Sequence, residues 1–314
     1  MNVADIITEH GAVYKDKGQS LASLYQVARR PFVSEECFTA VLTDETIWQA
    51  ARTTFDRIVQ PFQKLFTPSG TVAFQPLEIR MFHQKADTQE WPDDLEATWL
   101  GFLASGNLKR TEWPFIRWYL ETQFFPQIQQ DLELNEFAKG VYAAPVGGAV
   151  GAVGTSMNGY LKVIADQITA GRITPITMGV VPATDAAFVA YLEGFSDQID
   201  KRYWQSAMTL NMSESLVRRA QRGTLEKYGK NLVMNEQNLT LRFSNLTLKG
   251  LPGQIGSNRI WCTPKSNAIV LKKKTQNQKL VDVQGFERLV KFMTDWYLGV
   301  GFVLPEIVFC NDQP

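Results

Sequence analysis

The sequence predicts an α+β fold, in which amphipathic helices and alternating strands occupy different stretches of one chain. Several segments repeat apolar residues at three- and four-residue spacing, which is typical of helices with one buried face. Other segments alternate apolar and polar residues, which is typical of half-buried strands. Hydrophobic residues are 45% of the 314-residue chain and aromatic residues 11%, which is ample for the packed interior of one or two domains.

The N-terminal part, residues 1–65, is predicted to hold an arm and a first helix. Residues 1–35 mix turn formers with isolated apolar residues, and two interpretations stand: an arm that packs on a neighbour, or a disordered terminus. Asp44–Phe66 is predicted to be a helix that Pro61 ends or kinks. The residues that share its apolar face are Ile47, Ala51, Phe55, Ile58 and Phe62.

An extended hairpin is predicted over Phe66–Pro92. Its apolar residues alternate with polar ones, the alternation changes parity at Pro76, and Lys85–Pro92 is polar and loop-like. An isolated two-stranded ribbon is only marginally stable in water. We therefore expect the apolar residues to pack on a neighbouring subunit, although an ordinary surface hairpin has the same pattern. These residues are Phe66, Val72, Phe74, Leu77, Ile79 and Met81.

A long amphipathic helix is predicted over Trp113–Ala138. Its apolar stripe is expected to bury against a sheet while the other faces stay in water. Pro126 removes one backbone donor and is expected to bend the helix without ending it, because the pattern continues past it. The stripe consists of Ile116, Leu120, Phe124, Ile128 and Leu132.

Three acidic residues near the end of this helix are in a position that the helix dipole disfavours: Asp131, Glu133 and Glu136. This local conflict indicates a basic partner for at least one of them, an Arg or Lys within about 4 Å, with another subunit as one source. The alternative interpretation is three solvated acids.

The rest of the chain shows the same two patterns. The predicted helices are Asn158–Gly171, Thr184–Phe195 and Glu214–Lys227. The predicted strands are Met208–Met212, Asn238–Lys249, Ala268–Leu271, Leu280–Val283 and a strand-like close over Phe292–Phe309. Lys272–Lys274 is interpreted as part of a solvated hairpin tip, with contact to DNA as the alternative. We expect it to matter little to shell formation, because exposed charges contribute little to stability.

Overall charge excludes some classes of partner. Lys+Arg and Asp+Glu are both 32, so the chain lacks the basic excess of a dedicated nucleic-acid binder or a membrane-surface protein. No run approaches the roughly 18 apolar residues of a membrane span. Near-neutral proteins self-associate more readily than charged ones, which is weak support for assembly.

Few residues are suited to catalysis. The two histidines, His10 and His83, lie outside any Ser-, Cys- or metal-centred motif, and Cys37, Cys262 and Cys310 are too far apart for a zinc or disulfide pattern. The acids Asp93, Asp94 and Glu96 are interpreted as helix N-terminal carboxylates, with a metal-binding or hydrolytic site as the alternative. We expect no enzymatic activity, no metal and no cofactor.

The segment order resembles that of the Hong Kong 97-type major capsid proteins of tailed phages. Three local patterns contribute to the resemblance, which covers most of Phe66–Phe309. They are the acid-ended helix followed by a glycine loop over Pro145–Gly154, the turn Leu251-Pro252-Gly253 before Thr263-Pro264-Lys265-Ser266-Asn267, and the terminal Gly299-Val300-Gly301-Phe302 with Pro305-Glu306-Ile307-Val308.

The resemblance implies four structural parts. These are an N-terminal arm with a first helix (1–65), an extended loop (66–92), a peripheral domain with a long spine helix (93–145 and 238–314) and an axial domain (146–237). Because the extended loop begins by about Phe66, too early for a fused scaffolding segment, the scaffold is expected to be a separate protein or none.

The resemblance also implies a function. Such a protein self-assembles as hexamers and pentamers into the icosahedral shell that encloses phage double-stranded DNA. It is assembled in the host cytoplasm and resides in the virion. The implied partners are other copies of the chain, a portal protein, and a scaffold or decoration protein, with non-specific contact to DNA and none to a membrane. An encapsulin-like nanocompartment shell and a carboxylate-dependent hydrolase are the alternatives.

Overall fold

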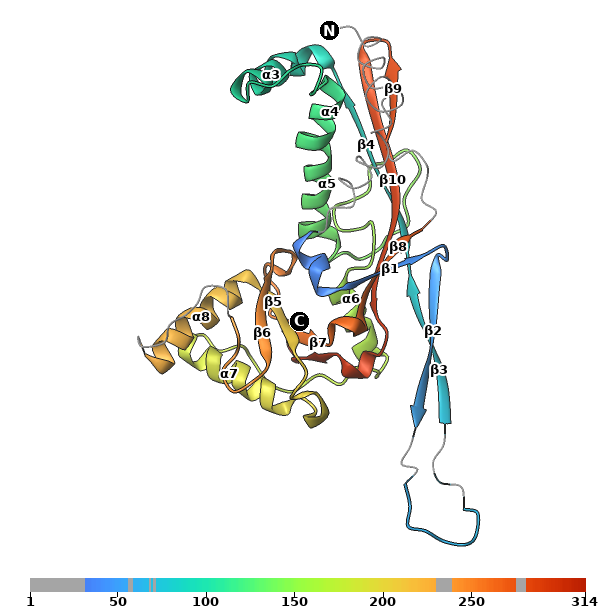
Figure 1. Cartoon of the computed structure of the whole chain (residues 1–314), viewed down its shortest axis with the longest axis vertical. Coiled ribbons are helices and arrows are strands. Elements are labelled where there is room, and N and C mark those ends of the chain that lie inside the picture. Colours follow the sequence, from blue (N-terminus) through green and yellow to red (C-terminus); the bar gives the residue numbers. More distant parts are fainter. Residues whose placement is uncertain (1–31, 56–58, 68, 70–71, 230–238, 275–280) are drawn as a thin grey trace.

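The computed structural model describes residues 32–55, 59–67, 69, 72–229, 239–274 and 281–314, and the side chains of 50–55 and 72–76 lie outside this description. The molecule is elongated (Figure 1). A long helix and a long sheet run side by side in its upper half, a second sheet with two helices lies to one side below, and a two-stranded ribbon projects at the bottom. The expectations for residues 1–31 of the arm lie outside the described residues.

The upper layer pairs helix with sheet. The sheet has the order β1-β8-β10-β4, with β9 also on β10. Its strands are β1 Thr39–Thr43, β4 Phe82–Glu90, β8 Ala268–Lys273, β9 Asp282–Phe286 and β10 Leu289–Phe302. β1 runs parallel to β8, and the other pairs are antiparallel. The helix α3 Pro92–Ser105 follows β4 at the top of the molecule.

The helix beside this sheet, here called the spine helix, runs from Phe115 to Glu136. It consists of α4 Phe115–Tyr119, α5 Phe125–Asp131 and two five-residue π-helical turns, η3 Leu120–Phe124 and η4 Leu132–Glu136. The first π turn precedes Pro126, whose ring would clash with the carbonyl one turn earlier in a regular α-helix. The predicted helix that continues past the proline is therefore confirmed.

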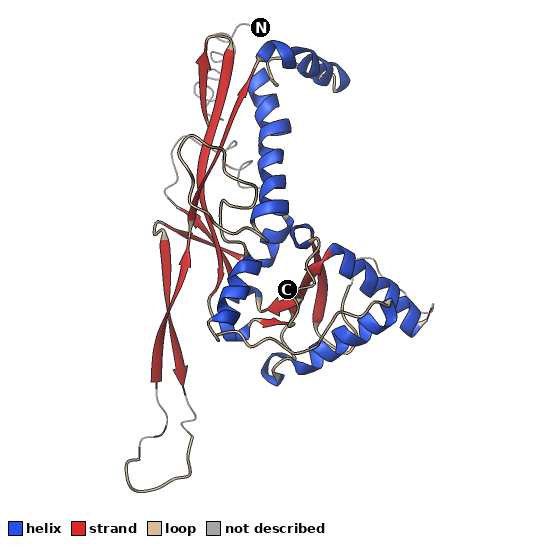
Figure 2. Cartoon of the chain, turned by 180° about the vertical axis from the view of Figure 1, so that it is seen from behind, coloured by secondary structure: helices blue, strands red, loops and turns tan. Residues whose placement is uncertain are grey.

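The predicted burial of the spine helix is also confirmed. Ile116, Leu120 and Phe124 are buried against the sheet, where the Tyr119 ring stacks on Phe292 of β10 at 4.5 Å. Figure 2 shows the helix lying along one side of the long strands for most of their length. Packed aromatic side chains thus join the spine helix to the upper sheet.

Two glycines of β10 allow the end of β3 to pack closely against that strand. A Cβ at Gly299 would lie 2.5 Å from the carbonyl oxygen of Arg80, and one at Gly301 would lie 2.7 Å from Ile79 Cδ1. No larger residue fits at either position without movement of the end of β3 (Val72–Arg80). The ribbon is therefore anchored where it meets the sheet.

The second sheet has the order β11-β7-β5-β6 and two helices packed beside it. Its strands are β5 Met208–Ser213, β6 Leu246–Leu251, β7 Trp261–Thr263 and β11 Phe309–Cys310. The helices are α7 Asp185–Gln198 and α8 Glu214–Tyr228, and α6 Tyr160–Thr169 lies between the two sheets. Because β6 and β7 pair with β5, the predicted domain boundary at residue 238 cuts through this sheet.

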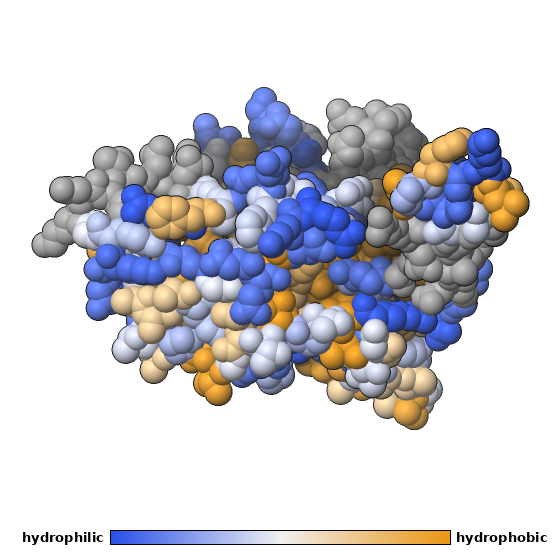
Figure 3. All heavy atoms as spheres, turned by 90° about the horizontal axis from the view of Figure 1, so that it is seen from below, coloured by the Kyte–Doolittle hydropathy of each residue, from blue (hydrophilic) through white to orange (hydrophobic). Residues whose placement is uncertain are grey.

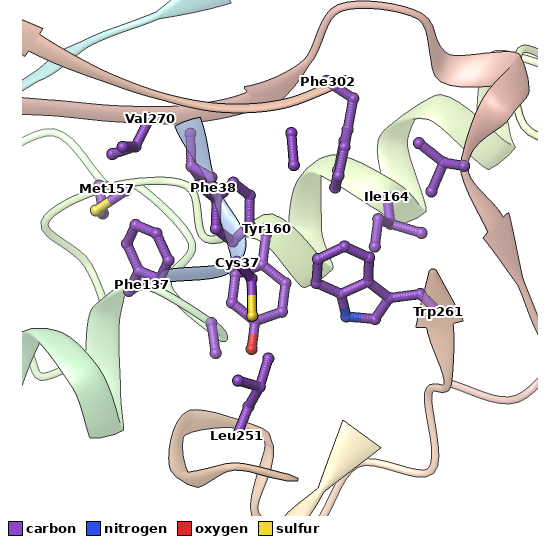
Figure 4. Close-up of a cluster of buried hydrophobic side chains, with 14 of the residues drawn as sticks. Cys37, Phe38, Phe137, Met157, Tyr160, Ile164, Leu251, Trp261, Val270 and Phe302 are labelled. Atoms are coloured by element: carbon purple, nitrogen blue, oxygen red, sulfur yellow. The ribbon is translucent and has the colours of Figure 1, made fainter. Parts of the chain in front are cut away.

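A buried aromatic cluster joins the two halves (Figure 4). Phe38 lies against Phe137 at the end of the spine helix, Tyr160 of α6, Trp261 of β7 and Phe302 of β10. The short 3-10 turn η2 Val33–Cys37 leads into it. The side chains of η2 bond to both halves: Ser34 to Glu133, Glu35 to Lys272, Glu36 to Lys249 and Cys37 to Asn211.

The predicted helix over Asp44–Phe66 is wrong. The chain forms β2 Ile47–Phe55, which pairs antiparallel with β3 from Ile47↔Arg80 to Phe55↔Val72. The apolar spacing within one segment cannot show which strand it pairs with. Here hydrogen bonding to β3 outweighs the helix-like spacing. The projecting ribbon is therefore β2–β3, and its turn lies around residues 59–67 and not within Phe66–Pro92.

Most of Lys85–Pro92 is likewise strand and not loop, because β4 continues to Glu90 and α3 begins at Pro92. β4 alternates buried Phe82 and Gln84 with exposed His83 and Lys85, and it pairs with β10 along its whole length. Gln84 masks the alternation because it is polar yet buried, donating a hydrogen bond to Ser156 Oγ at 2.9 Å. β4 therefore belongs to the upper sheet.

Three expectations near the C-terminal end need correction. Leu239–Leu248 folds back on itself, with Leu241 and Leu248 N–H groups bonded to the carbonyls of Leu246 and Leu239, so only its second half enters the sheet. The last strand is the short β11, preceded by the 3-10 turn η8 Pro305–Ile307. Lys272 and Lys273 lie inside β8, and Lys272 is not a solvated tip residue but pairs with buried Glu35.

Candidate functional site

The end of the ribbon exposes an apolar surface, here called the loop tip, within residues 59–67. Its four large apolar side chains are between 76% and 92% exposed: Val59, Phe62, Leu65 and Phe66. Gln60 Nε2 donates to the carbonyl of Thr67 at 2.6 Å, and Gln63 Nε2 donates to Thr67 Oγ1 at 2.5 Å, so local polar contacts shape the turn. The apolar side chains themselves point away from the chain's own core.

The predicted contact residues of the hairpin divide into three groups. Phe66 lies in the loop tip and is exposed. Val72 and Phe74 lie in β3, and their side chains are outside the described part. Leu77, Ile79 and Met81 are buried at 4–5% exposure within the chain itself, where Ile79 and Met81 pack with Ile269 and Leu271 of β8. For these last three residues, an internal contact replaces the expected one.

The three acids at the end of the spine helix are hydrogen-bonded to neutral donors. Glu136 accepts hydrogen bonds from Gly154 N at 2.8 Å, Ser156 N at 2.9 Å and Ser156 Oγ at 2.7 Å. Glu133 is buried and accepts from Ser34 N at 3.1 Å and from Ser34 Oγ. Asp131 is exposed and accepts from Gln127 Nε2 at 2.9 Å.

Amide and hydroxyl donors thus compensate the carboxylates that the helix dipole disfavours. Among the described residues, no Lys or Arg forms an ion pair with any of the three acids. A basic partner on another subunit stays a prediction, and exposed Asp131 is the acid best placed for it.

A second exposed apolar surface lies on the glycine loop. Val146, Val150 and Val153 are 74%, 101% and 78% exposed, and Gly147, Gly148 and Gly151 separate them along the chain. The loop is closed at its base by bonds from Val141 N to the carbonyl of Gly154 and from Ala143 N to that of Thr155. A rigid base with an apolar edge suits contact with another molecule.

The groups available for chemistry are either buried or dispersed. Burial raises the pKa of the Cys37 and Cys310 thiols to about 11, and it raises the pKa of Cys262 still further, so all three thiols stay protonated near neutral pH. His83 stacks on Tyr297 with ring centroids 4.2 Å apart, and its Nε2 lies 2.8 Å from Asp295. Within the described part of the chain, no group of His, Cys, Asp and Glu is arranged to hold a metal ion.

A cavity of about 460 Å³ beside the second sheet lacks, among the described residues, the paired acid and base that a reaction site needs. Its lining includes Asp197 and Tyr203 as titratable groups, together with Trp204 and Phe243. A carboxylate hydrolase needs a second acid or base facing the first. Asp93, Asp94 and Glu96 are distant from this cavity, in the first turns of α3.

The apolar spacing of the sequence does not predict the loop tip, because it places Phe62 on a helical face and gives no role to Val59 or Leu65. Pro61 lies within the tip, and Pro68 directly follows it in the sequence. Together with the adjacent β-branched and aromatic residues Thr53, Thr54 and Phe55, they are the signal that favours a ribbon over a helix.

Comparison of the sequence with protein-family models and with curated proteins found no match. Comparison with solved structures found similar subunits in phage capsids and in an encapsulin. The satellite phage P4 procapsid, including its size determination (Sid) protein, matches at TM-score 0.59 and 10% identity, over 92% of this chain and 89% of that one. The chain has the Hong Kong 97-like capsid fold.

Two further structures with this fold are similar. The capsid of Myoviridae phage XM1 matches at TM-score 0.52 and 9% identity, over 89% of this chain and 90% of that one. The SrpI encapsulin complex of Synechococcus elongatus PCC 7942 matches at TM-score 0.50 and 11% identity, over 90% of this chain and 87% of that one. Among the described helices, none combines the length and hydrophobicity that crossing a membrane requires.

Proposed function

We propose that this chain is a major capsid protein, which self-assembles as hexamers and pentamers into the icosahedral shell that encloses phage double-stranded DNA. Its role is structural, without an enzymatic step. The observation that carries the proposal is the loop tip, an apolar surface at the end of a two-stranded ribbon. Such a ribbon gains stability by packing on another molecule, and the capsid-type fold makes a second copy of the chain the natural receiver.

The whole architecture supports this proposal. The spine helix and the upper sheet form a stiff, aromatic-packed body, while the loop tip and the glycine loop carry apolar residues at its margins. Figure 3 views the molecule from the ribbon end: polar residues cover most of this face, and hydrophobic residues appear in a hollow near the middle and on projecting edges. This distribution favours contacts between copies over a single enclosed site.

The partners follow from the same proposal. A portal protein and a separate scaffold or decoration protein would complete the particle, which would assemble in the host cytoplasm and persist as the virion shell. A net charge of zero suits a wall that encloses DNA without binding it strongly, since phosphate binding depends on a basic excess. No contact with a membrane is part of the proposal.

The test replaces two exposed rings of the loop tip, as Phe62→Ser with Phe66→Ser. These side chains are 92% and 89% exposed, so the isolated subunit should keep its stability while it loses apolar contact area with its neighbour. We expect closed particles, counted by electron microscopy and sized by gel filtration, to become rare. The matched control is Lys64→Ser in the same loop, which should assemble normally; normal assembly of the double variant would contradict the proposal.

A nanocompartment shell is the second candidate, because the SrpI encapsulin shares the fold at TM-score 0.50. Particle contents separate the two. A phage capsid expressed with its packaging machinery holds nuclease-protected DNA, whereas a compartment holds a cargo protein in fixed ratio to the shell protein.

A further inference from the structure

The helix α3 presents an apolar face that stays exposed among the described residues. It lies at the end of the molecule opposite the loop tip (Figure 1). Its inner side is buried through Trp99, whose Nε1 donates to the carbonyl of Trp113 at 3.0 Å, and through Leu103. The outer residues Ala97, Leu100, Gly101 and Ala104 are all exposed.

These four residues share one side of the helix, because they follow each other at three- and four-residue spacing. Leu100 is 48% exposed, and a Cβ added at Gly101 would meet no atom within 4 Å. Small side chains around one leucine let a second helix approach closely, so that the leucine packs against its backbone.

The charges at the two ends of α3 are opposite in sign. Exposed Asp94 lies in the first turn, and exposed Lys109 follows the last turn. The chain reverses at Gly106 and Asn107, with Leu108 N bonded to the carbonyl of Leu103 at 2.9 Å, so Lys109 stays beside the helix end. An antiparallel copy of the helix would bring acid to base at both ends at once, since a two-fold contact repeats each pair.

We propose that α3 is a contact between two copies of this chain, in which two α3 helices pack antiparallel about an axis beside Leu100 and Gly101. In this contact each Asp94 faces the Lys109 of the partner copy. The proposal rests on the proposed shell-forming function and names a contact site separate from the loop tip. The apolar face supplies affinity, and the end charges select the antiparallel arrangement. In a parallel pair, each Asp94 would lie beside the Asp94 of the other copy and each Lys109 beside the other Lys109, so like charges would repel.

The first experiment is a cross-link. Gly101→Cys places a thiol next to the proposed axis, and the three native thiols are buried and unreactive. Oxidation of assembled particles with copper phenanthroline should convert most of the subunits to disulfide-linked dimers on a non-reducing gel. Ser266→Cys, exposed between β7 and β8 and outside α3, is the matched control and should stay monomeric.

The second experiment exchanges the charges. Asp94→Lys and Lys109→Asp should each lower the yield of closed particles, and the double variant should restore it, because the acid and base meet again with positions swapped. Leu100→Asp should lower the yield about tenfold or more, since it places an uncompensated charge in an apolar contact.

The outcomes separate this proposal from the function on which it rests. The α3 contact would be overturned, and the shell function would stand, if particles form normally but two further results are negative. These results are that Gly101→Cys gives no disulfide-linked dimer and that the charge variants do not change particle yield. A Gly101→Cys cross-link to a different protein would also overturn it, by assigning the face to a decoration or scaffold protein. A wild-type chain that forms no particles under any condition would overturn both.

Discussion

Lys272 shows how one residue can change meaning between sequence and structure. Within Lys272–Lys274 it is one of three neighbouring cations next to a polar segment, a pattern typical of solvated loops. In the fold its side chain is 19% exposed and pairs with Glu35, whose side chain is 9% exposed. The partner lies more than two hundred residues away along the chain, and a local pattern carries no information about it. The interpretation of the whole run as a solvated tip is therefore wrong for Lys272, and the expectation that the run matters little to shell formation stays a prediction.

Replacing Lys272 with Ala leaves the Glu35 carboxylate buried without its cation. We expect the free energy of unfolding to fall by about 3 kcal/mol, as when one partner of a buried pair is removed. The urea midpoint of the subunit measures this change. Lys274→Ala, at an exposed residue directly after β8, should change the free energy of unfolding by less than about 0.5 kcal/mol. Equal shifts for both variants would show that the pair does not stabilise the fold.

At the scale of elements, prediction succeeded where one face of a segment decides its structure. The spine helix, α6, α7, α8 and β5 follow their own periodicity, since each buries a single stripe or run against the core. β2 and β4 were missed because pairing partners decide them: β3 and β10 respectively. The loop tip was missed with β2. Of its four apolar residues the sequence pattern selects only Phe66, which is exposed and whose contact with another copy stays a prediction.

The packing of α7 on α8 depends on one small residue. A Cβ at Gly223 would lie 2.0 Å from the carbonyl oxygen of Asp185, so Gly223→Ala must push the helices apart. We expect a loss of about 2 kcal/mol in the free energy of unfolding, which a lower thermal midpoint would report. Gly194→Ala in α7 is the control: its Cβ would meet Met178 Cε at 3.4 Å, and higher helix propensity should leave stability unchanged or raised.

The whole molecule places its apolar contact surfaces at opposite ends, with the loop tip below and α3 above. Positive and negative side chains balance, so long-range electrostatics neither drives nor opposes association. We therefore expect assembly to depend on apolar burial at the two ends, with exposed ion pairs contributing only to selectivity.

Salt dependence tests this balance. Between about 0.1 M and about 1 M sodium chloride, the screening length falls from about 10 Å to about 3 Å. We expect the yield of closed particles to stay constant or rise, because salt weakens surface ion pairs but not apolar contacts. Gel filtration of matched samples measures the yield. A steep fall with salt would show that charge, and not the loop tip, supplies most of the association energy.

In a shell, we expect the two-stranded ribbon to act as a lever that turns as one unit about its junction with β10. Its strands are nine residues long, so the ribbon extends about 30 Å from its pivot at Gly299 and Gly301. A rotation of about 10° at the pivot would carry the tip about 5 Å, while the hydrogen bonds between β2 and β3 stay intact. The proposed contact at the loop tip would then persist over a range of angles, and identical subunits would close a curved surface without remaking it.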